Sequence, residues 1–189
     1  KANGQSRIEV AFLAGDETFV GGFACASARI RDMAEVALAS VAGVGVTLKC
    51  VSDRLQDDRE IVLAAVRRTG WALRYASRQL QADPEIVQTA LAQSALAIEF
   101  VPDELLTFDM VLAAVKSAPE TLSHIAARWK ENREIVCAAV AVDGCALEYA
   151  AASLKDDPEV VRLAVENTPL AYQFAGAKAA KSEELLKLA

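Results

Sequence analysis

The stretch LQDDREIVLAAV, residues 55–66, returns along the chain in close copies. These copies are LQADPEIVQTAL from Leu80, WKENREIVCAAV from Trp129 and LKDDPEVVRLAV from Leu154. Each copy sets a short polar residue and an acidic residue directly before an apolar run. A catalytic centre needs each of its residues only once, so repetition on this scale indicates architecture.

Residues of the type that caps helix N-termini stand before the apolar runs. They are Asp58, Asp83, Thr107, Asn132, Asp157 and Ser182, spaced 25, 24, 25, 25 and 25 residues apart. The oxygen of such a side chain can accept a hydrogen bond from an orphan amide in the first helical turn. An acidic residue follows two positions after each cap, where it suits the positive end of the helix dipole. The repeated phrase therefore predicts a helix start, with each cap contributing about 1 kcal/mol.

The apolar residues after each cap are spaced by three and four, which predicts a helix with one buried stripe. Ile61, Val62, Ala65 and Val66 form the first such stripe. Thr69, Ser94, Asp143 and Thr168 form a second column of capping residues, which predicts a second helix in each repeat.

The second helix is expected to run through WALRYASRQL from Trp71 and CALEYAAASL from Cys145. Leu73, Leu80 and Leu105 are among its predicted buried residues. Pro102 should kink this helix or begin it afresh, because proline cannot donate the backbone hydrogen bond of a helix interior.

Two helices of about ten residues each are marginal alone in water and need neighbours to cover their apolar stripes. The sequence therefore predicts an all-α solenoid of about five to six 25-residue two-helix repeats. Residues 48–189 form the predicted repeat array, whose last repeat is incomplete. Residues 1–47 form a predicted N-terminal cap, with a β-hairpin in residues 7–22 and then a helix that resembles a degenerate repeat.

The composition and charge of the chain argue against several classes of partner and site. The 189-residue chain carries a net charge of −6, which argues against nucleic-acid and anionic-membrane partners. No apolar run approaches the length of a membrane span, so we expect no transmembrane segment. The four cysteines are few and form no C-x-x-C pair, which favours an intracellular reducing compartment and argues against zinc.

Candidate catalytic and metal-binding residues all have simpler interpretations. His124 falls in a column of aromatic residues, Tyr75, Phe100, Tyr149 and Phe174, so we interpret it as a semi-buried ring that replaces an aromatic side chain. The acidic pairs at residues 57–58 and 156–157 turn helical at once, so capping explains them better than calcium binding. The sequence therefore predicts no catalytic residue, no metal site and no cofactor.

One surface feature stands out from the repeat. Arginines gather on one repeat and acidic residues on the next, which is usual for a solvated face but can also position a partner. The predicted protein-binding surface comprises Arg67, Arg74, Arg78, Glu99 and Asp103.

LKDDPEVVRLAVENTPLAYQFA from Leu154 and LQDDREIVLAAVRRTGWALRYAS from Leu55 resemble the repeats of the domain-of-unknown-function family DUF4116. The resemblance covers roughly residues 48–189 and rests on D-x-E-hydrophobic-hydrophobic-x-x-A-V followed by G-x-A-L-x-Y-A. The repeat beginning at Thr107 departs most, since it lacks the acidic cap and the tyrosine. The resemblance implies an α-helical repeat of bacterial, effector and protist proteins and transfers no catalytic or ligand-binding residue.

We therefore expect a non-catalytic interaction or scaffold module that binds protein partners, as a structural subunit or part of a larger complex. The alternative is the repeat region of a longer enzyme or bacterial effector whose catalytic domain lies outside this chain. A third hypothesis is ligand binding in a groove lined by the aromatic column. The chain starts with Lys1 rather than methionine, so processing and an organellar location stay open.

Overall fold

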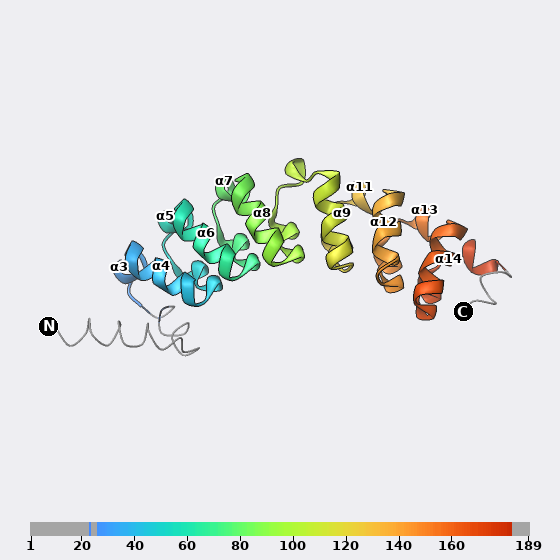
Figure 1. Ribbon diagram of the computed structural model, residues 1–189, viewed down its shortest axis with the longest axis horizontal. Coiled ribbons are helices and arrows are strands. Elements are labelled where there is room, and N and C mark those ends of the chain that lie inside the picture. Colours follow the sequence, from blue (N-terminus) through green and yellow to red (C-terminus); the bar gives the residue numbers. More distant parts are fainter. Residues whose placement is uncertain (1–22, 24–25, 183–189) are drawn as a thin grey trace. The chain divides into compact units, whose positions relative to one another are not determined.

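The computed structural model describes residue 23 and residues 26–182, and all regular structure within these residues is helical (Figure 1). The chain divides into two compact units, residues 1–101 and residues 102–189. The β-hairpin predicted for residues 7–22 lies outside the described residues, as does the helix predicted to follow Ser182.

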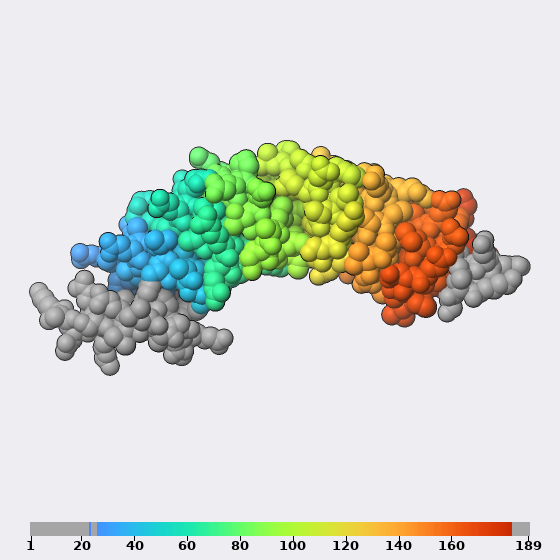
Figure 2. All heavy atoms as spheres, in the orientation of Figure 1, coloured from blue at the N-terminus to red at the C-terminus, as the bar shows by residue number. Residues whose placement is uncertain are grey.

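The first unit repeats one order of elements, a short helix, a long helix and a 3-10 helix. The elements are α3 (Ala28–Arg31), α4 (Ala34–Gly43), η1 (Gly45–Cys50), α5 (Asp53–Gln56), α6 (Arg59–Arg68), η2 (Gly70–Tyr75), α7 (Arg78–Gln81), α8 (Pro84–Gln93) and η3 (Ala95–Phe100). The long helices α4, α6 and α8 pack side by side in sequence order, and the 3-10 helices η1, η2 and η3 do the same. In the space-filling view, the blue, cyan and green segments of this unit lie against one another in that order (Figure 2).

The second unit follows the same plan with one irregular repeat at its start. Its elements are η4 (Asp103–Leu105), α9 (Phe108–Ser117), α10 (Thr121–His124), α11 (Ala127–Lys130), α12 (Arg133–Val140), η5 (Gly144–Tyr149), α13 (Ala152–Lys155), α14 (Pro158–Asn167), η6 (Pro169–Phe174) and η7 (Ala179–Lys181). The long helix α12 packs against both α9 and α14, and η5 packs against η6.

The prediction of one continuous second helix of about ten residues in each repeat is wrong. The structure divides this segment into a 3-10 helix and a short α-helix, such as η2 and α7. Between η2 and α7 the backbone is extended at Ala76 and Ser77, with ψ angles of 156° and 155°. At this break the Ser77 amide donates to the Gln56 carbonyl of the preceding repeat across 3.0 Å. The equivalent bond joins Ser52 to Arg31 at 3.2 Å. A continuous helix would use these amides internally, so the break provides a backbone bond between neighbouring repeats.

The core lies between the long helices and the 3-10 helices. The apolar stripes predicted for α6, α12 and α14 are buried, and Ile61, Val62, Ala65 and Val66 illustrate them. The 3-10 helices contribute the buried residues Leu73, Ile98 and Leu147, and α10 contributes Leu122.

Leu105 is the exception among the predicted buried leucines. It is 43% exposed, while the next residue, Leu106, is 8% exposed. Pro102 restarts the chain there as the three-residue η4, in place of the four-residue α-helix found in neighbouring repeats. The tighter turn of the 3-10 helix moves the buried position along by one residue.

Glycine at the start of a 3-10 helix sets how closely neighbouring repeats approach. A Cβ atom on Gly70 would lie 2.5 Å from the Ala90 carbonyl oxygen of the following long helix. Gly45 meets Ala65 and Gly144 meets Ala164 in the same way. The backbones touch directly at these points, so any side chain would push the repeats apart.

Candidate interaction surface

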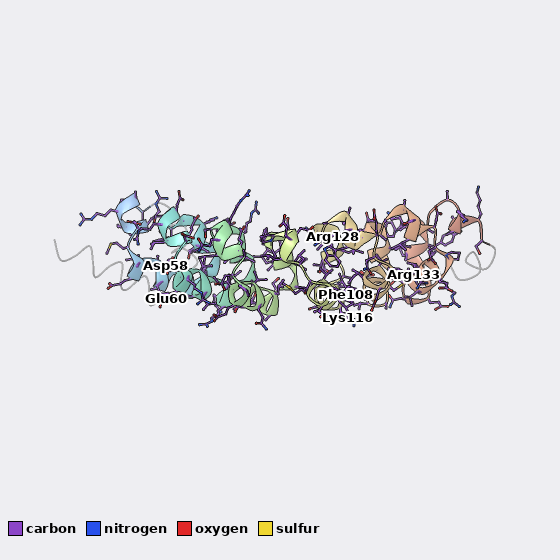
Figure 3. All side chains as sticks on the ribbon, turned by 90° about the horizontal axis from the view of Figure 1, so that it is seen from above. Asp58, Glu60, Phe108, Lys116, Arg128 and Arg133 are labelled. Atoms are coloured by element: carbon purple, nitrogen blue, oxygen red, sulfur yellow. The ribbon has the colours of Figure 1, made fainter. Side chains whose placement is uncertain are left out.

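The predicted caps of the long helices are confirmed where the structure describes their helices. Asp58, Asp83, Asn132 and Asp157 each accept hydrogen bonds from two amides of the first turn, at 2.9–3.3 Å. Thr107 accepts one such bond, from the Met110 amide at 3.3 Å. Figure 3 shows Asp58 beside Glu60 at the start of α6. These polar groups are therefore used in building helices.

The second column of caps is confirmed at one position only. Asp143 accepts from the Cys145 amide at 2.9 Å, whereas Thr69, Ser94 and Thr168 make no side-chain cap. Thr168 instead accepts a hydrogen bond from the Gly144 amide of the preceding repeat at 3.2 Å. Its hydroxyl therefore joins two repeats.

Two caps are also held by an arginine of the preceding repeat. Arg59, the first residue of α6, donates to Asp83 at 3.1 Å and also pairs with Glu85. Arg133, at the start of α12 in Figure 3, pairs in the same way with Asp157 and Glu159. We call these pairings the arginine clamps. Sequence reasoning missed them, although an arginine directly after the cap in two repeats was an available signal.

The clamps and the caps together hold carboxylates in their charged form. The Ile86 amide and then the Arg59 guanidinium lower the pKa of Asp83 below its usual value. Burial raises the pKa of Asp157, but the amides of Val160 and Glu159 and the Arg133 guanidinium outweigh it and lower the pKa overall.

The first acid of each acidic pair has a different role from the predicted capping. Asp57 accepts a hydrogen bond from the hydroxyl of Ser77 in the next repeat. Asp32, which stands 25 residues earlier and belongs to no acidic pair, accepts one from the Ser52 hydroxyl at 2.5 Å. Asp156 accepts the amide of Lys178 at 2.8 Å. These acids connect repeats, and the described residues contain no cluster of His, Cys, Asp and Glu suited to a metal ion.

The remaining chemical candidates lack the setting of a reactive group. His124 is exposed at the end of α10, so its predicted semi-buried position is wrong: this repeat forms α10 where others form a longer 3-10 helix. Burial raises the pKa of the Cys137 thiol, with Arg133 opposing it, and burial also raises the pKa of Cys145. Both thiols are therefore less readily ionised than a free cysteine.

The predicted charged surface belongs to both units. Arg67 lies in the last turn of α6, Arg74 lies in η2 and Arg78 begins α7. All three are exposed, as is Glu99 of η3. Asp103 belongs to the second unit, where its carboxylate lies 3.2 Å from Arg128. Among the residues that the structure describes, no carboxylate pairs with the three arginines.

An exposed tryptophan accompanies these arginines and was missed as a surface residue. Trp71 is 36% exposed, and its ring meets that of Phe100 edge to face, with centroids 5.4 Å apart. The Arg74 guanidinium lies 5.9 Å from the same Phe100 ring. Trp71 and Arg74 meet one ring because side chains three residues apart lie on the same face of a 3-10 helix. We call Arg67, Trp71, Arg74 and Phe100 the Trp71 surface.

Within residue 23 and residues 26–182, no helix is both long and apolar enough to cross a membrane. The longest helices among these residues span ten residues.

Comparison with known proteins identifies the family of the repeat. The family model for the domain of unknown function DUF4116 matches residues 35–81, 62–106, 107–155 and 132–178. The predicted boundary between residues 47 and 48 lies inside the first of these matches. Searches of curated proteins and of solved structures each found no match. Because the family matches extend from residue 35 to residue 178, the chain belongs to the DUF4116 family.

Proposed function

We propose that this protein is a non-catalytic interaction module, a helical solenoid that binds other proteins as part of a larger assembly. The observation that carries the proposal is the exposed Trp71 surface. Tryptophan and arginine dominate the binding energy of protein interfaces, and here both stand at the surface on a rigid element.

We propose no catalytic role because the polar groups of the repeat make structural contacts within the protein. The recurring acids cap helices, clamp an arginine or accept hydrogen bonds from the next repeat. An acid or base in catalysis must reach a substrate, and carboxylates engaged in this way are directed at the protein itself. These contacts support a structural role for the motif that defines the repeat.

The solenoid is a proposal built on contacts between consecutive repeats. Within each unit, consecutive repeats meet through backbone bonds, close glycine approaches or clamps, and the first two repeats of the second unit meet through the ion pair of Arg128 with Asp103. Contacts confined to neighbours are typical of a one-dimensional stack. We propose about five to six repeats of about 25 residues, arranged in one array.

The test is affinity capture from native extract with cross-linking and mass spectrometry. We expect wild-type protein to retain specific partners that Trp71→Ala loses, while both proteins keep the same helical circular dichroism. Leu170→Ala is the matched control, because it removes an apolar side chain that is 65% exposed in the other unit. A protein that retains no partner, or the same partners in all three forms, would contradict the proposal.

A further inference from the structure

We propose that the Trp71 surface binds an acidic segment of a partner protein that also carries an aromatic or leucine side chain. The inference rests on the proposed interaction function and specifies the chemistry of the partner. It combines two features of the first unit: arginines that pair with no carboxylate among the described residues, and an aromatic pair at the surface.

The arginines of this unit differ in how they are used. Arg54 pairs with Asp32, Arg59 is clamped by Asp83 and Glu85, and Arg68 donates to the Gly43 carbonyl at 3.0 Å. Arg67 and Arg74 have no such anion among the described residues, and both flank Trp71 in sequence. A carboxylate from outside would therefore pair with the Arg74 guanidinium beside the aromatic pair without displacing an ion pair made by the described residues, and Arg67 adds a second positive charge on the adjoining helix.

The aromatic pair gives this surface a rigid apolar centre. Both the Trp71 ring and the Arg74 guanidinium of η2 contact the Phe100 ring of the neighbouring η3. A partner side chain packed on Trp71 would exclude water from the nearby guanidinium and so strengthen its attraction to a carboxylate. Because the surface is already ordered, little conformational entropy is lost on binding.

The charges favour a peptide over a nucleic acid. Glu99 is adjacent to Phe100, and the whole chain carries a net charge of −6. A continuous phosphate backbone would be repelled by the overall negative charge of the chain. A peptide can place its carboxylates against Arg67 and Arg74 and a neutral residue beside Glu99.

The inference is tested by selecting random displayed peptides on the full-length protein. We expect the selected peptides to be enriched in Asp and Glu beside Trp, Phe or Leu. A labelled synthetic copy of the most enriched peptide is then measured by fluorescence anisotropy. Trp71→Ala and the double change Arg67→Glu with Arg74→Glu should each weaken its binding at least about tenfold. Added salt should weaken binding to the wild type.

Arg162→Glu is the matched control, because it reverses the charge of an exposed arginine on α14 in the other unit and should leave affinity unchanged. Selected peptides that are neutral or basic, or binding that survives both Trp71-surface variants, would overturn the inference. Displacement of the peptide by a single-stranded oligonucleotide at equal concentration would overturn it too. If native partners are captured through Trp71 but the peptides are not acidic, the inference fails and the interaction function stands. If neither partners nor peptides bind, both fail.

Discussion

The Nε atom of Arg59 lies 3.1 Å from the Asp83 carboxylate, so the first residue of α6 holds the cap of α8. The same carboxylate accepts the amides of Glu85 and Ile86 through its other oxygen. One side chain therefore starts its own helix and joins that helix to the preceding repeat. Capping alone does not require a fixed spacing between the acids. A link to the preceding repeat does, so this double use explains why the acids recur at a fixed interval.

Replacing the arginine of a clamp should lower the melting temperature at low salt. We expect Arg59→Ala to melt earlier than wild type, with a difference that shrinks as salt screens the exposed ion pair. Arg67→Ala is the control, because Arg67 lies on the same helix without a described carboxylate partner. Equal melting temperatures for the two variants at every salt concentration would show that the clamp contributes nothing.

Removing the whole capping side chain of Asp83 should lower the free energy of unfolding more than removing only its charge. Asp83→Ala and Asp157→Ala should each lower the free energy of unfolding by about 1 kcal/mol, because two amides lose their acceptor. Asp83→Asn should lose less, since Asn132 caps α12 with the same geometry in this chain. Urea denaturation measures both changes. An Asn variant as unstable as the Ala variant would mean that the clamp, and not the cap, dominates at this position.

Acid should destabilise the protein through these same carboxylates. The pKa values of Asp83 and Asp157 are lower in the folded protein than the ordinary value of about 3.9 expected in the unfolded chain. Such groups contribute stability above the unfolded pKa and lose it as the pH falls through the folded pKa. We therefore expect the melting temperature to fall below about pH 4. The double variant Asp83→Asn with Asp157→Asn should show a smaller fall over the same range, and an equal fall would contradict this assignment.

The close approach at Gly70 gives a sharp steric test. Gly70→Ala should lower the free energy of unfolding by about 1–3 kcal/mol, because the new methyl group would overlap the Ala90 carbonyl. Gly43→Ala is the matched control. A Cβ there meets no atom within 4 Å, and alanine favours the helix in which Gly43 stands. Urea denaturation that finds both variants equally stable would show that the repeats can separate without cost.

A buried serine offers a stabilising change. Ser40 is 2% exposed in α4, and its hydroxyl has no hydrogen-bond partner among the described residues. The equivalent position in the next two long helices is alanine, at Ala65 and Ala90. Ser40→Ala should therefore raise the free energy of unfolding by about 1 kcal/mol, measured with urea. Thr47→Val is the contrasting change, since the Thr47 hydroxyl donates to the Val44 carbonyl at 2.8 Å. We expect that variant to be destabilised, and a destabilised Ser40→Ala would contradict the assignment.

The long helices and their caps were predictable because their causes are local. Asp83 meets amides only two and three residues away, so a short stretch contains the whole interaction. The buried stripe of Ile61, Val62, Ala65 and Val66 was equally visible, because helical periodicity selects which residues share a face. Family membership followed from the same recurring pattern.

The links between repeats could not be obtained in this way, because they join residues about 25 positions apart. The backbone bond from Ser77 to Gln56 breaks a helix that local propensity alone would have continued. The clamp of Arg59 on Asp83 and the exchange of Leu105 for Leu106 likewise depend on where the next repeat lies. The contact of Trp71 with Phe100 also joins two repeats, and Trp71 is 36% exposed. Local chemistry therefore specifies where each helix begins, whereas packing against the neighbouring repeat selects which side chains remain exposed.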